Sequence, residues 1–405
     1  MTTPLRDNAG TKADKMSSNG KLPHPIHVVM VTPFPNNADH IDGGVAGVAK
    51  YLCDELVKQG NNIILTVIAP TIEVRKRVRE QWPDFEVYRF GANKIWSFLP
   101  GTLYYVAIGR RKLNQLLAEL NPDIVHYQGL CYLAGNCEFP HVLTIHGIAE
   151  RDALWVGKGL KRWFKYFLLK ITEDNGRRRV RHIISISPYI AEVIGKTIKK
   201  AKSVLIENPV ADSYFDIHWQ PQKGRIFCCG RIIPRKNTLG LLASFVRIAA
   251  DFPQAQLRLA GSAEQSYLNK CKEFVVEHGL VQQIHFLGNL SIKNVQNELA
   301  KANCLVIPSF QETAPLVIEE AMAVGVPVVG ASVCGLPYMI KEGQTGLLID
   351  PYDSNTITEA LYKILKNELF TYSISQKSRE EAQNRFQASA IAKRTVDVYY
   401  DILKT

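Results

Sequence analysis

The sequence has few of the features that mark secreted, disulfide-stabilised or membrane-spanning proteins. Its eight cysteines contain no Cys-x-x-Cys pair and mostly lie in apolar segments, which favours free thiols in a reducing interior over disulfides or zinc. Residues 1–24 are polar and contain no apolar stretch of the kind that a secretory signal requires. We interpret them as a disordered tail and expect a cytoplasmic protein.

Long hydrophobic runs, short repeats and low-complexity tracts are missing as well. The uncharged run over residues 321–340 is about as long as the ~20 residues that a membrane helix needs, but its glycines and prolines predict helix, strand and turn instead. With 46% hydrophobic and 21% charged residues, the composition is that of an ordinary globular protein. A chain of 405 residues exceeds the roughly 250 that one core usually supports, so we expect two domains.

From Ile26 onward, short apolar β-branched runs alternate with longer amphipathic segments, as parallel sheets covered by helices require. The first series predicts strands at 26–32, 63–69, 123–128, 141–146 and 182–187, with helices at 45–59, 102–120 and 158–180. A polar, aromatic stretch follows Asn208, and the alternation restarts at Arg225. The second series predicts strands at 225–229, 255–260, 284–287, 303–308 and 327–330, with helices at 238–250, 264–278, 291–302, 315–324 and 354–368.

This pattern predicts the fold class α/β, with two doubly wound Rossmann-like domains facing a cleft. We place the domains at residues 25–207 and 224–385, joined by a linker over 208–223. A final helix in 386–405 is expected to pack back on the first domain. Because ligands of open parallel sheets bind beyond the carboxyl ends of the strands, the residues that follow each strand are the candidates for function.

Arg231 and Lys236 form the first candidate pair, in a turn after the strand that ends before Gly230. Arginine presents a planar fork that matches phosphate oxygens, and lysine adds a compact point charge. Together they can neutralise a diphosphate. The alternative is a basic turn that only faces water.

Glu312 and Glu320 form the second pair, one in the loop after a predicted strand and one in the helix that follows. Pro315 suits the first turn of that helix, where the free N–H groups of Leu316 and Val317 would face an anion. A carboxylate only accepts hydrogen bonds, which suits the hydroxyls of a ribose or hexose. In a continuous helix the two would lie ~12 Å apart along the axis, against roughly 5–9.5 Å in a glycosidase pair, so binding roles are favoured. The alternatives are a helix-surface charge and a capping residue.

In this order the motifs resemble those of the retaining glycosyltransferases of family 4, which have two Rossmann lobes (the GT-B type). The resemblance extends over nearly all of Ile26 to Asp353. The matching marks are Gly43-Gly44, Thr144-Ile145-His146-Gly147, Gly230-Arg231 with Lys236, the spacing of Glu312 and Glu320, Gly325-Val-Pro-Val-Val and Gly343-Gln-Thr-Gly346. The resemblance implies transfer of a sugar from a nucleotide-sugar donor to an acceptor hydroxyl with retention, in polysaccharide, glycolipid or other glycoconjugate synthesis.

The same resemblance implies roles for individual residues. Arg231 and Lys236 would hold the diphosphate, Glu312 the hydroxyls of the donor sugar, and Glu320 the ribose. His146 would contact the donor sugar or line the reaction centre, or else be satisfied at a strand end. The remaining donor contacts are expected from Gly43, Gly44, Ala314, Leu316 and Val317, where the two glycines let backbone approach closely or form a plain turn. The catalytic candidates are His146, Arg231, Lys236 and Glu312, whereas we interpret His126 as structural.

Three positions depart from the family pattern and concern the identity of the donor. Pro315 stands where many relatives have glycine and removes an N–H group. Asn208-Pro209-Val210 replaces the usual asparagine-glycine, and Tyr338 stands where glutamate is frequent.

The sequence has no Asp-x-Asp, the carboxylate pair that holds a divalent ion in the other main glycosyltransferase fold. We therefore expect no metal and no cofactor beyond the nucleotide sugar as co-substrate. The leaving phosphate could accept the proton of the acceptor, and closure about the linker would exclude water. The alternatives are a nucleotide-sugar 2-epimerase and a non-catalytic sugar-nucleotide-binding protein. A dinucleotide oxidoreductase would need Gly-x-Gly-x-x-Gly where this chain has Asp42-Gly-Gly-Val-Ala-Gly.

The formal net charge of +11 indicates a surface that attracts anions. Much of it gathers in residues 158–181, opposed there by Glu173 and Asp174. The basic residues are Lys158, Lys161, Arg162, Lys165, Lys170, Arg177, Arg178, Arg179 and Arg181, around the apolar Leu160, Trp163, Phe164, Phe167, Leu168 and Ile171. Such a helix can lie on an anionic membrane, which would make the protein peripheral on the inner face. The acceptor is expected to be a carbohydrate or, if the helix docks, a lipid-linked sugar or other membrane-bound substrate. The alternative is a helix that covers the first sheet. We expect no nucleic-acid partner.

Overall fold

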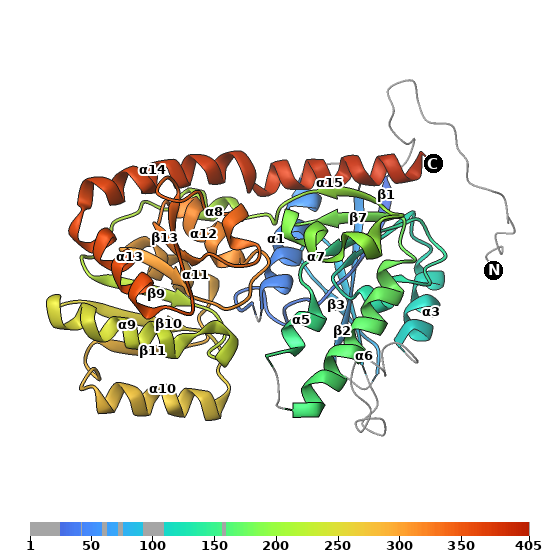
Figure 1. Ribbon diagram of the computed structural model, residues 1–405. Helices are drawn as coiled ribbons and strands as arrows, with labels where there is room; N and C mark the ends of the chain where they lie inside the picture. The colour runs from blue at the N-terminus through green and yellow to red at the C-terminus, as the bar shows by residue number, and fades with distance from the viewer. Residues whose placement is uncertain are drawn as a thin grey trace, which may run out of the picture.

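The computed structural model describes residues 25–41, 43–58, 63–71, 76–91, 109–155 and 159–404. The predicted tail over 1–24, the first part of the predicted helix 102–120 (residues 102–108), and Lys158 lie outside these residues. Figure 1 shows two α/β domains side by side, each built on a twisted sheet with helices on its faces. Among the helices so described, none combines the length and the apolar character needed to span a bilayer.

The N-terminal domain contains an eight-stranded sheet in the described residues, ordered β3-β4-β2-β1-β5-β6-β7-β8. Its strands are β1 (Ile26–Val31), β2 (Ile63–Thr71), β3 (Val78–Gln81), β4 (Glu86–Gly91), β5 (Ile124–Gln128), β6 (His141–Ile145), β7 (His182–Ser185) and β8 (Lys202–Leu205). Neighbouring strands are parallel except β3 and β4. The helices are α1 (Gly44–Lys58), α3 (Arg110–Leu120), α4 (Cys131–Ala134), α5 (Ala149–Ala153), α6 (Gly159–Arg177) and α7 (Pro188–Ile198).

The C-terminal domain repeats this plan with a parallel sheet ordered β11-β10-β9-β12-β13-β14. Its strands are β9 (Arg225–Cys229), β10 (Gln256–Ala260), β11 (Ile284–Gly288), β12 (Cys304–Ile307), β13 (Val328–Ala331) and β14 (Gly346–Ile349). The helices are α8 (Asp212–Phe215), η3 (Pro234–Lys236), α9 (Thr238–Asp251), α10 (Gln265–Glu277), α11 (Ile292–Lys301), α12 (Leu316–Val324), η4 (Leu336–Tyr338), α13 (Ser354–Lys366) and α14 (Glu368–Arg385).

Both sheets reverse their strand order at one point, between β1 and β5 and between β9 and β12. Two loops that diverge at such a point leave a crevice beyond the carboxyl ends of the strands. The predicted fold class, two doubly wound Rossmann-like domains, is confirmed. The sequence reasoning missed the strands β3, β4, β8 and β14 and the helices α4, α5, α7, α8 and α14. It also placed Pro315 in the first helical turn, whereas Pro315 is the N-cap of α12.

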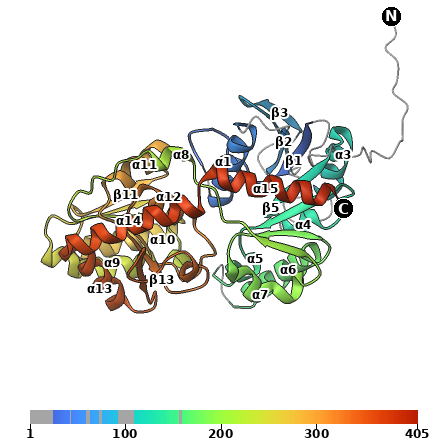
Figure 2. The same cartoon turned by 90° about the horizontal axis from the view of Figure 1, so that it is seen from above.

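The chain crosses between the domains twice, and the two crossings lie side by side. Val210 donates its N–H to the carbonyl of Phe386 (2.8 Å), and Ala388 donates to the carbonyl of Val210 (3.2 Å). After the second crossing, α15 (Ala388–Leu403) returns to the N-terminal domain, where Tyr399 is buried in the same apolar cluster as residues of β1 and α1. Figure 2 shows α14 and α15 running in succession over both domains. A paired crossing of this kind can act as the pivot of a closing motion.

Candidate active site

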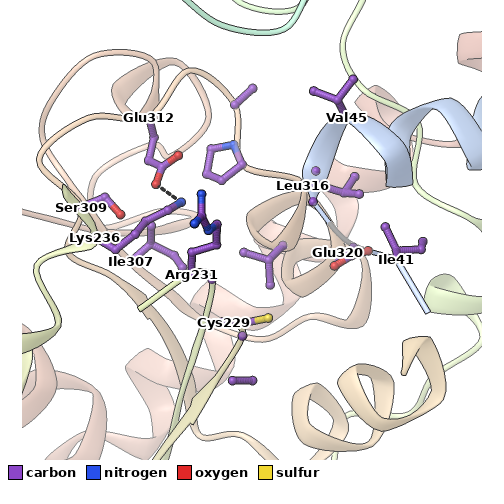
Figure 3. Close-up of a pocket in the computed structure, with 18 of the residues that line it drawn as sticks. Ile41, Val45, Cys229, Arg231, Lys236, Ile307, Ser309, Glu312, Leu316 and Glu320 are labelled. Atoms are coloured by element: carbon purple, nitrogen blue, oxygen red, sulfur yellow. Dashed lines mark hydrogen bonds and ion pairs between the residues drawn. The ribbon is translucent and has the colours of Figure 1, made fainter. Parts of the chain in front are cut away.

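A cavity of about 800 Å³ lies between the two domains, at the carboxyl ends of the central strands. Every site residue predicted from the sequence lines it: Gly43, Gly44, His146, Arg231, Lys236, Glu312, Ala314, Leu316, Val317 and Glu320. The topology explains this convergence, because the loops after β9 and β12 flank one switch point and the loops after β1 and β6 face them from the other domain. Figure 3 shows the two glutamates on either side of the basic pair.

The basic pair follows β9. Arg231 is exposed, and Lys236 lies at the end of η3, where its ammonium group forms an ion pair with the carboxylate of Glu312 (Figure 3). Arg235 adds a second cation 3.7 Å from the other oxygen of that carboxylate. Burial raises the pKa of Glu312, but Lys236 and Arg235 lower it further, so the net pKa lies below its ordinary value and the carboxylate is ionised at neutral pH.

The start of α12 supplies N–H donors next to this cluster. Pro315 precedes the helix with no side-chain cap, and Leu316 and Val317 are its first two residues, both lining the cavity. The first N–H groups of a helix have no intrahelical partner, and the helix dipole places partial positive charge there. With Arg231 and Lys236 this end of the cavity can bind a diphosphate.

Glu320, in the middle of α12, faces the cavity and is not the helix-surface charge of the alternative interpretation. It is 7% exposed, and Tyr51 of α1 donates a hydrogen bond to its Oε1 across the domain boundary (3.0 Å). Burial raises the pKa of Glu320 to about 7, against the opposing effect of hydrogen bonds from Tyr214 and Tyr51. This carboxylate is already positioned to accept hydroxyl hydrogens.

The N-terminal wall is formed by the glycines after β1 and the histidine after β6. Gly43 has a φ of +103°, which favours glycine, and a Cβ at Gly43 or Gly44 would meet nothing within 4 Å. Backbone therefore faces the cavity directly at both positions. Nε2 of His146 lies 2.5 Å from Oε1 of Gln128, an amide oxygen that only accepts hydrogen bonds, and burial lowers the pKa of His146 to about 4. His146 is consequently a neutral imidazole at physiological pH.

A second set of contacts, which sequence reasoning missed, bridges the cleft between the domains. Asp152 of α5 accepts a hydrogen bond from Nε2 of Gln311 (2.8 Å) and lies 3.8 Å from Nε of Arg235. Trp155 donates to Oε1 of Gln311 (3.2 Å) and stacks on Phe310, with ring centroids 4.9 Å apart. Gln311 and Phe310 directly precede Glu312, but no local signal in the sequence pairs them with a short helix of the other domain. Across the described ranges, no group of three or more His, Cys, Asp or Glu side chains is arranged to hold a metal ion.

The two Rossmann-like domains and the cleft between them form the GT-B architecture. A family model described as Glycosyltransferase Family 4 matches residues 42–214, and one described as Glycosyl transferases group 1 matches residues 212–385. The chain belongs to the family 4 type of glycosyltransferases.

Individual relatives agree with this assignment. The chain is 27% identical over 248 residues to the uncharacterised glycosyltransferase MJ1178 of Methanocaldococcus jannaschii, a match that covers 61% of this chain and only 65% of that protein. The sucrose-phosphate synthase of Thermosynechococcus elongatus shares the fold with a TM-score of 0.79 at 20% identity, covering 94% of this chain and 99% of that one. The Anabaena protein HepE, solved in complex with UDP-glucose, has a TM-score of 0.68 at 16% identity, covering 92% and 99%.

Proposed function

We propose that the chain is a retaining, metal-independent hexosyltransferase that works in polysaccharide, glycolipid or other glycoconjugate synthesis. The observation that carries this proposal is the order of groups along the cavity. Glu320 lies at one end, Arg231 and Lys236 lie with the α12 N-terminus, and Glu312 lies beyond the ammonium group of Lys236. A nucleotide sugar bound along this line has its ribose at Glu320, its diphosphate at the cations, and its sugar at Glu312.

The ion pair of Lys236 and Glu312 suits a change of partners during the reaction. When the donor enters, the ammonium group of Lys236 contacts the phosphate, and the ionised carboxylate of Glu312 becomes free to accept hydrogen bonds from the sugar. The bond between the anomeric carbon and the phosphate oxygen breaks, and a bond to the acceptor oxygen forms on the same face. The acceptor proton passes to the leaving phosphate, whose growing charge Arg231 and Lys236 stabilise.

Retention is supported by the state of the carboxylates that line the cavity. Glu312 is held by Lys236, Glu320 by Tyr51, and Asp152 by Gln311. Glu320 and Asp152 are engaged in binding or in bridging the cleft, and Glu312, once Lys236 leaves it, accepts hydrogen bonds from the sugar, which favours a same-face reaction without a protein nucleophile. The solved complex of HepE with UDP-glucose supports a nucleotide sugar of this kind as donor.

The test is a thermal-shift panel with UDP-, GDP- and ADP-sugars, because a ligand that binds only the folded state raises Tm. The donor found is then used with carbohydrate and lipid-linked acceptors, and the anomeric configuration of the product is read by NMR. We expect one nucleotide class to raise Tm and the product to keep the configuration of the donor. An inverted product would refute retention, and conversion of the donor sugar without an acceptor would support the 2-epimerase. Activity abolished by a chelator would contradict metal independence.

We also propose that α6 docks on an anionic membrane and that the acceptor is lipid-linked, which would place the protein on the cytoplasmic face. The apolar side of α6 faces solvent and not the sheet, contrary to the covering-helix alternative: Leu160 is 89% exposed, Phe164 69% and Ile171 68%. Lys161 and Lys165 are exposed on the same turns. In Figure 1 the first turns of α6 extend beyond the other helices of the domain.

One basic residue that the sequence analysis placed on this surface does not lie there. Arg177 is fully buried, where it forms ion pairs with Glu150 (2.7 Å), Asp174 (3.3 Å) and Glu173 (3.6 Å). Glu150 and Glu173 oppose Arg177 inside the domain, whereas Asp174 also forms an ion pair with the half-exposed Lys170 (3.1 Å). Periodicity alone did not separate the buried arginine from its exposed neighbours.

Vesicle co-sedimentation tests the docking. The parent protein should pellet with anionic but not neutral vesicles, and less at high salt. The double variant Lys161→Glu/Lys165→Glu should remain in solution, because each basic residue near an anionic surface contributes about 1 kcal/mol. The control Lys270→Glu/Lys272→Glu makes the same charge change on exposed positions of α10 and should behave like the parent. Equal sedimentation with neutral and anionic vesicles, or equal loss in both variants, would end the proposal.

A further inference from the structure

Two buried tyrosines lie against Glu320, the carboxylate that we assign to the ribose of the donor. The hydroxyl of Tyr51 in α1 donates to Oε1 of Glu320 (3.0 Å) and lies 3.3 Å from the hydroxyl of Tyr214 in α8. The two rings meet edge to face, with centroids 6.2 Å apart. Tyr51 is 4% exposed and Tyr214 is 1% exposed, so water competes little for these hydrogen bonds. All three residues line the cavity, at the end where Figure 3 shows Glu320.

Tyr51 reaches Glu320 because α1 packs on both domains at once. Val48 and Tyr51 are buried in the apolar cluster that forms the core of the C-terminal domain. Leu52 and Leu56 are buried instead in a cluster of the N-terminal domain. The members of each pair are three or four positions apart and so share one face of the helix. One face of α1 therefore packs on its own sheet while another packs on α12, and the ribose end of the cavity is built from both domains.

The hydroxyl groups leave room on the carboxylate for a ligand. Each tyrosine hydroxyl has a single hydrogen to donate, whereas an ionised carboxylate accepts through about four lone pairs. Tyr51 and Tyr214 therefore fill at most half of these positions, and the others remain for the hydroxyls of a ribose. Burial raises the pKa of Glu320 to about 7, and hydrogen bonds from Tyr214 and Tyr51 oppose this rise because they stabilise the ionised form. The two tyrosines thus favour the charge state that accepts hydrogen bonds.

Other titratable groups lie on the elements around Glu320: Cys229 of β9, Glu319 of α12, Asp54 of α1, Asp212 of α8, Glu298 of α11 and Arg379 of α14. Burial raises the pKa of Cys229 to about 12 and also raises the pKa of Glu319. Asp54 and Glu298 form ion pairs with basic residues, and Arg379 donates to backbone carbonyl groups. Asp212 is exposed to solvent. Across the described residues, the groups that favour the ionised form of Glu320 are the hydroxyls of Tyr214 and Tyr51.

We propose that Tyr51 and Tyr214 are positioning residues that hold the carboxylate of Glu320 in place for the ribose hydroxyls of the donor. Because Tyr51 belongs to the N-terminal domain, the ribose subsite is complete only when α1 is docked on α12. The proposal rests on the proposed transferase function. It assigns α1 a role in donor binding through a side chain that the sequence analysis did not single out.

The pH dependence of donor affinity tests this role. Calorimetry uses the nucleotide sugar found by the thermal-shift panel, because its diphosphate does not titrate near neutral pH. Affinity in the parent should rise as Glu320 ionises, with a midpoint near pH 7. Tyr51→Phe removes only a hydroxyl group, so the midpoint should move up by about one pH unit. Its affinity at pH 7 should fall about fivefold, in proportion to the ionised fraction, and should return to the parental value above pH 9.

Two further tyrosine variants complete this comparison. Tyr214→Phe should shift the midpoint in the same direction as Tyr51→Phe, because both hydroxyls act on the same carboxylate. The matched control is Tyr372→Phe in α14, where the ring is 58% exposed, and it should behave like the parent. A parental midpoint in both Tyr51→Phe and Tyr214→Phe, or tighter donor binding in Tyr51→Phe, would overturn the proposal.

A double-mutant comparison separates positioning from general damage to the fold. In the background of Glu320→Gln, which does not ionise, Tyr51→Phe should cause no pH-dependent loss of donor affinity. An equal loss in both backgrounds, independent of pH, would show that Tyr51 acts only on the fold and would refute the positioning role. If the nucleotide sugar binds with the expected pH dependence but no sugar is transferred to any acceptor, the proposed function fails and the positioning role stands.

Discussion

Replacing Glu320 by glutamine should have two opposite effects, stabilising the unliganded protein at pH 8 and weakening its affinity for the donor. The carboxyl group is 7% exposed and accepts a hydrogen bond from Tyr51 at 3.0 Å. Glutamine can accept the same hydrogen bond through its oxygen but carries no charge that burial would penalise. The substitution therefore removes a cost to the fold together with the charge that serves the ligand.

The structure sets the size of the first effect. The pKa of Glu320 rises from an ordinary 4.5 to about 7, mainly through burial. Because one pKa unit is worth about 1.4 kcal/mol, this difference corresponds to about 3 kcal/mol. The folded state keeps the proton of Glu320 to higher pH than the unfolded chain does. The stability that the protonated carboxyl group contributes is therefore complete below pH 4.5 and is lost as the pH rises to about 7. Glu320→Gln does not lose this stability at high pH, because glutamine does not ionise.

The assay is the Tm of the parent and of Glu320→Gln between pH 5 and pH 8.5. The variant's advantage should grow with pH and level off near pH 8 at roughly 6–12 °C, from roughly 2–4 °C per kcal/mol for a domain of this size. Calorimetry at pH 8 should show donor affinity reduced about tenfold or more, as expected for a charged acceptor. Glu359→Gln, at an exposed position of α13, is the control and should match the parent in both measurements. Parallel Tm curves for parent and Glu320→Gln, or equal donor affinity, would refute the reasoning.

Four further substitutions test other parts of the structure. Arg231→Ala and Lys236→Ala should each lower kcat at saturating donor by about tenfold or more, because the charge of the leaving group is greatest in the transition state; near-parental turnover in both would contradict the diphosphate site. Arg177→Met should destabilise the protein by about 3–5 kcal/mol in urea titration, because it leaves Glu150 buried without its partner, and an unchanged midpoint would contradict this. Gly335→Ala should reduce both donor affinity and Tm, since a Cβ there would lie 1.7 Å from a backbone oxygen of the loop before α12. Parental values for both would show that this loop can move aside.

The sequence alone determined the fold class and the line of donor-site candidates. Parallel strands end at a common edge of their sheet, so residues that follow β9 and β12, such as Arg231 and Glu312, meet whatever the details of packing. The spacing of Glu312 and Glu320 is likewise local, because the start of one helix positions both. The short edge strands β3, β8 and β14 escaped notice because four residues carry too little periodicity to separate a strand from a loop.

Only the tertiary structure decided which groups face one another. Helical spacing showed that Leu160, Phe164 and Ile171 share one face of α6, but the packing of α4 and α5 on its other side determined that this face meets water. The hydrogen bond of Tyr399 to His126 joins residues 273 positions apart, and that of Tyr51 to Glu320 joins residues 269 apart. Each depends on how two domains and a returning helix dock, and no local pattern records the partner of a side chain across such a distance. For this reason the sequence identified candidate donor-site residues, whereas the raised pKa of Glu320 and the lowered pKa of His146 follow from the folded molecule.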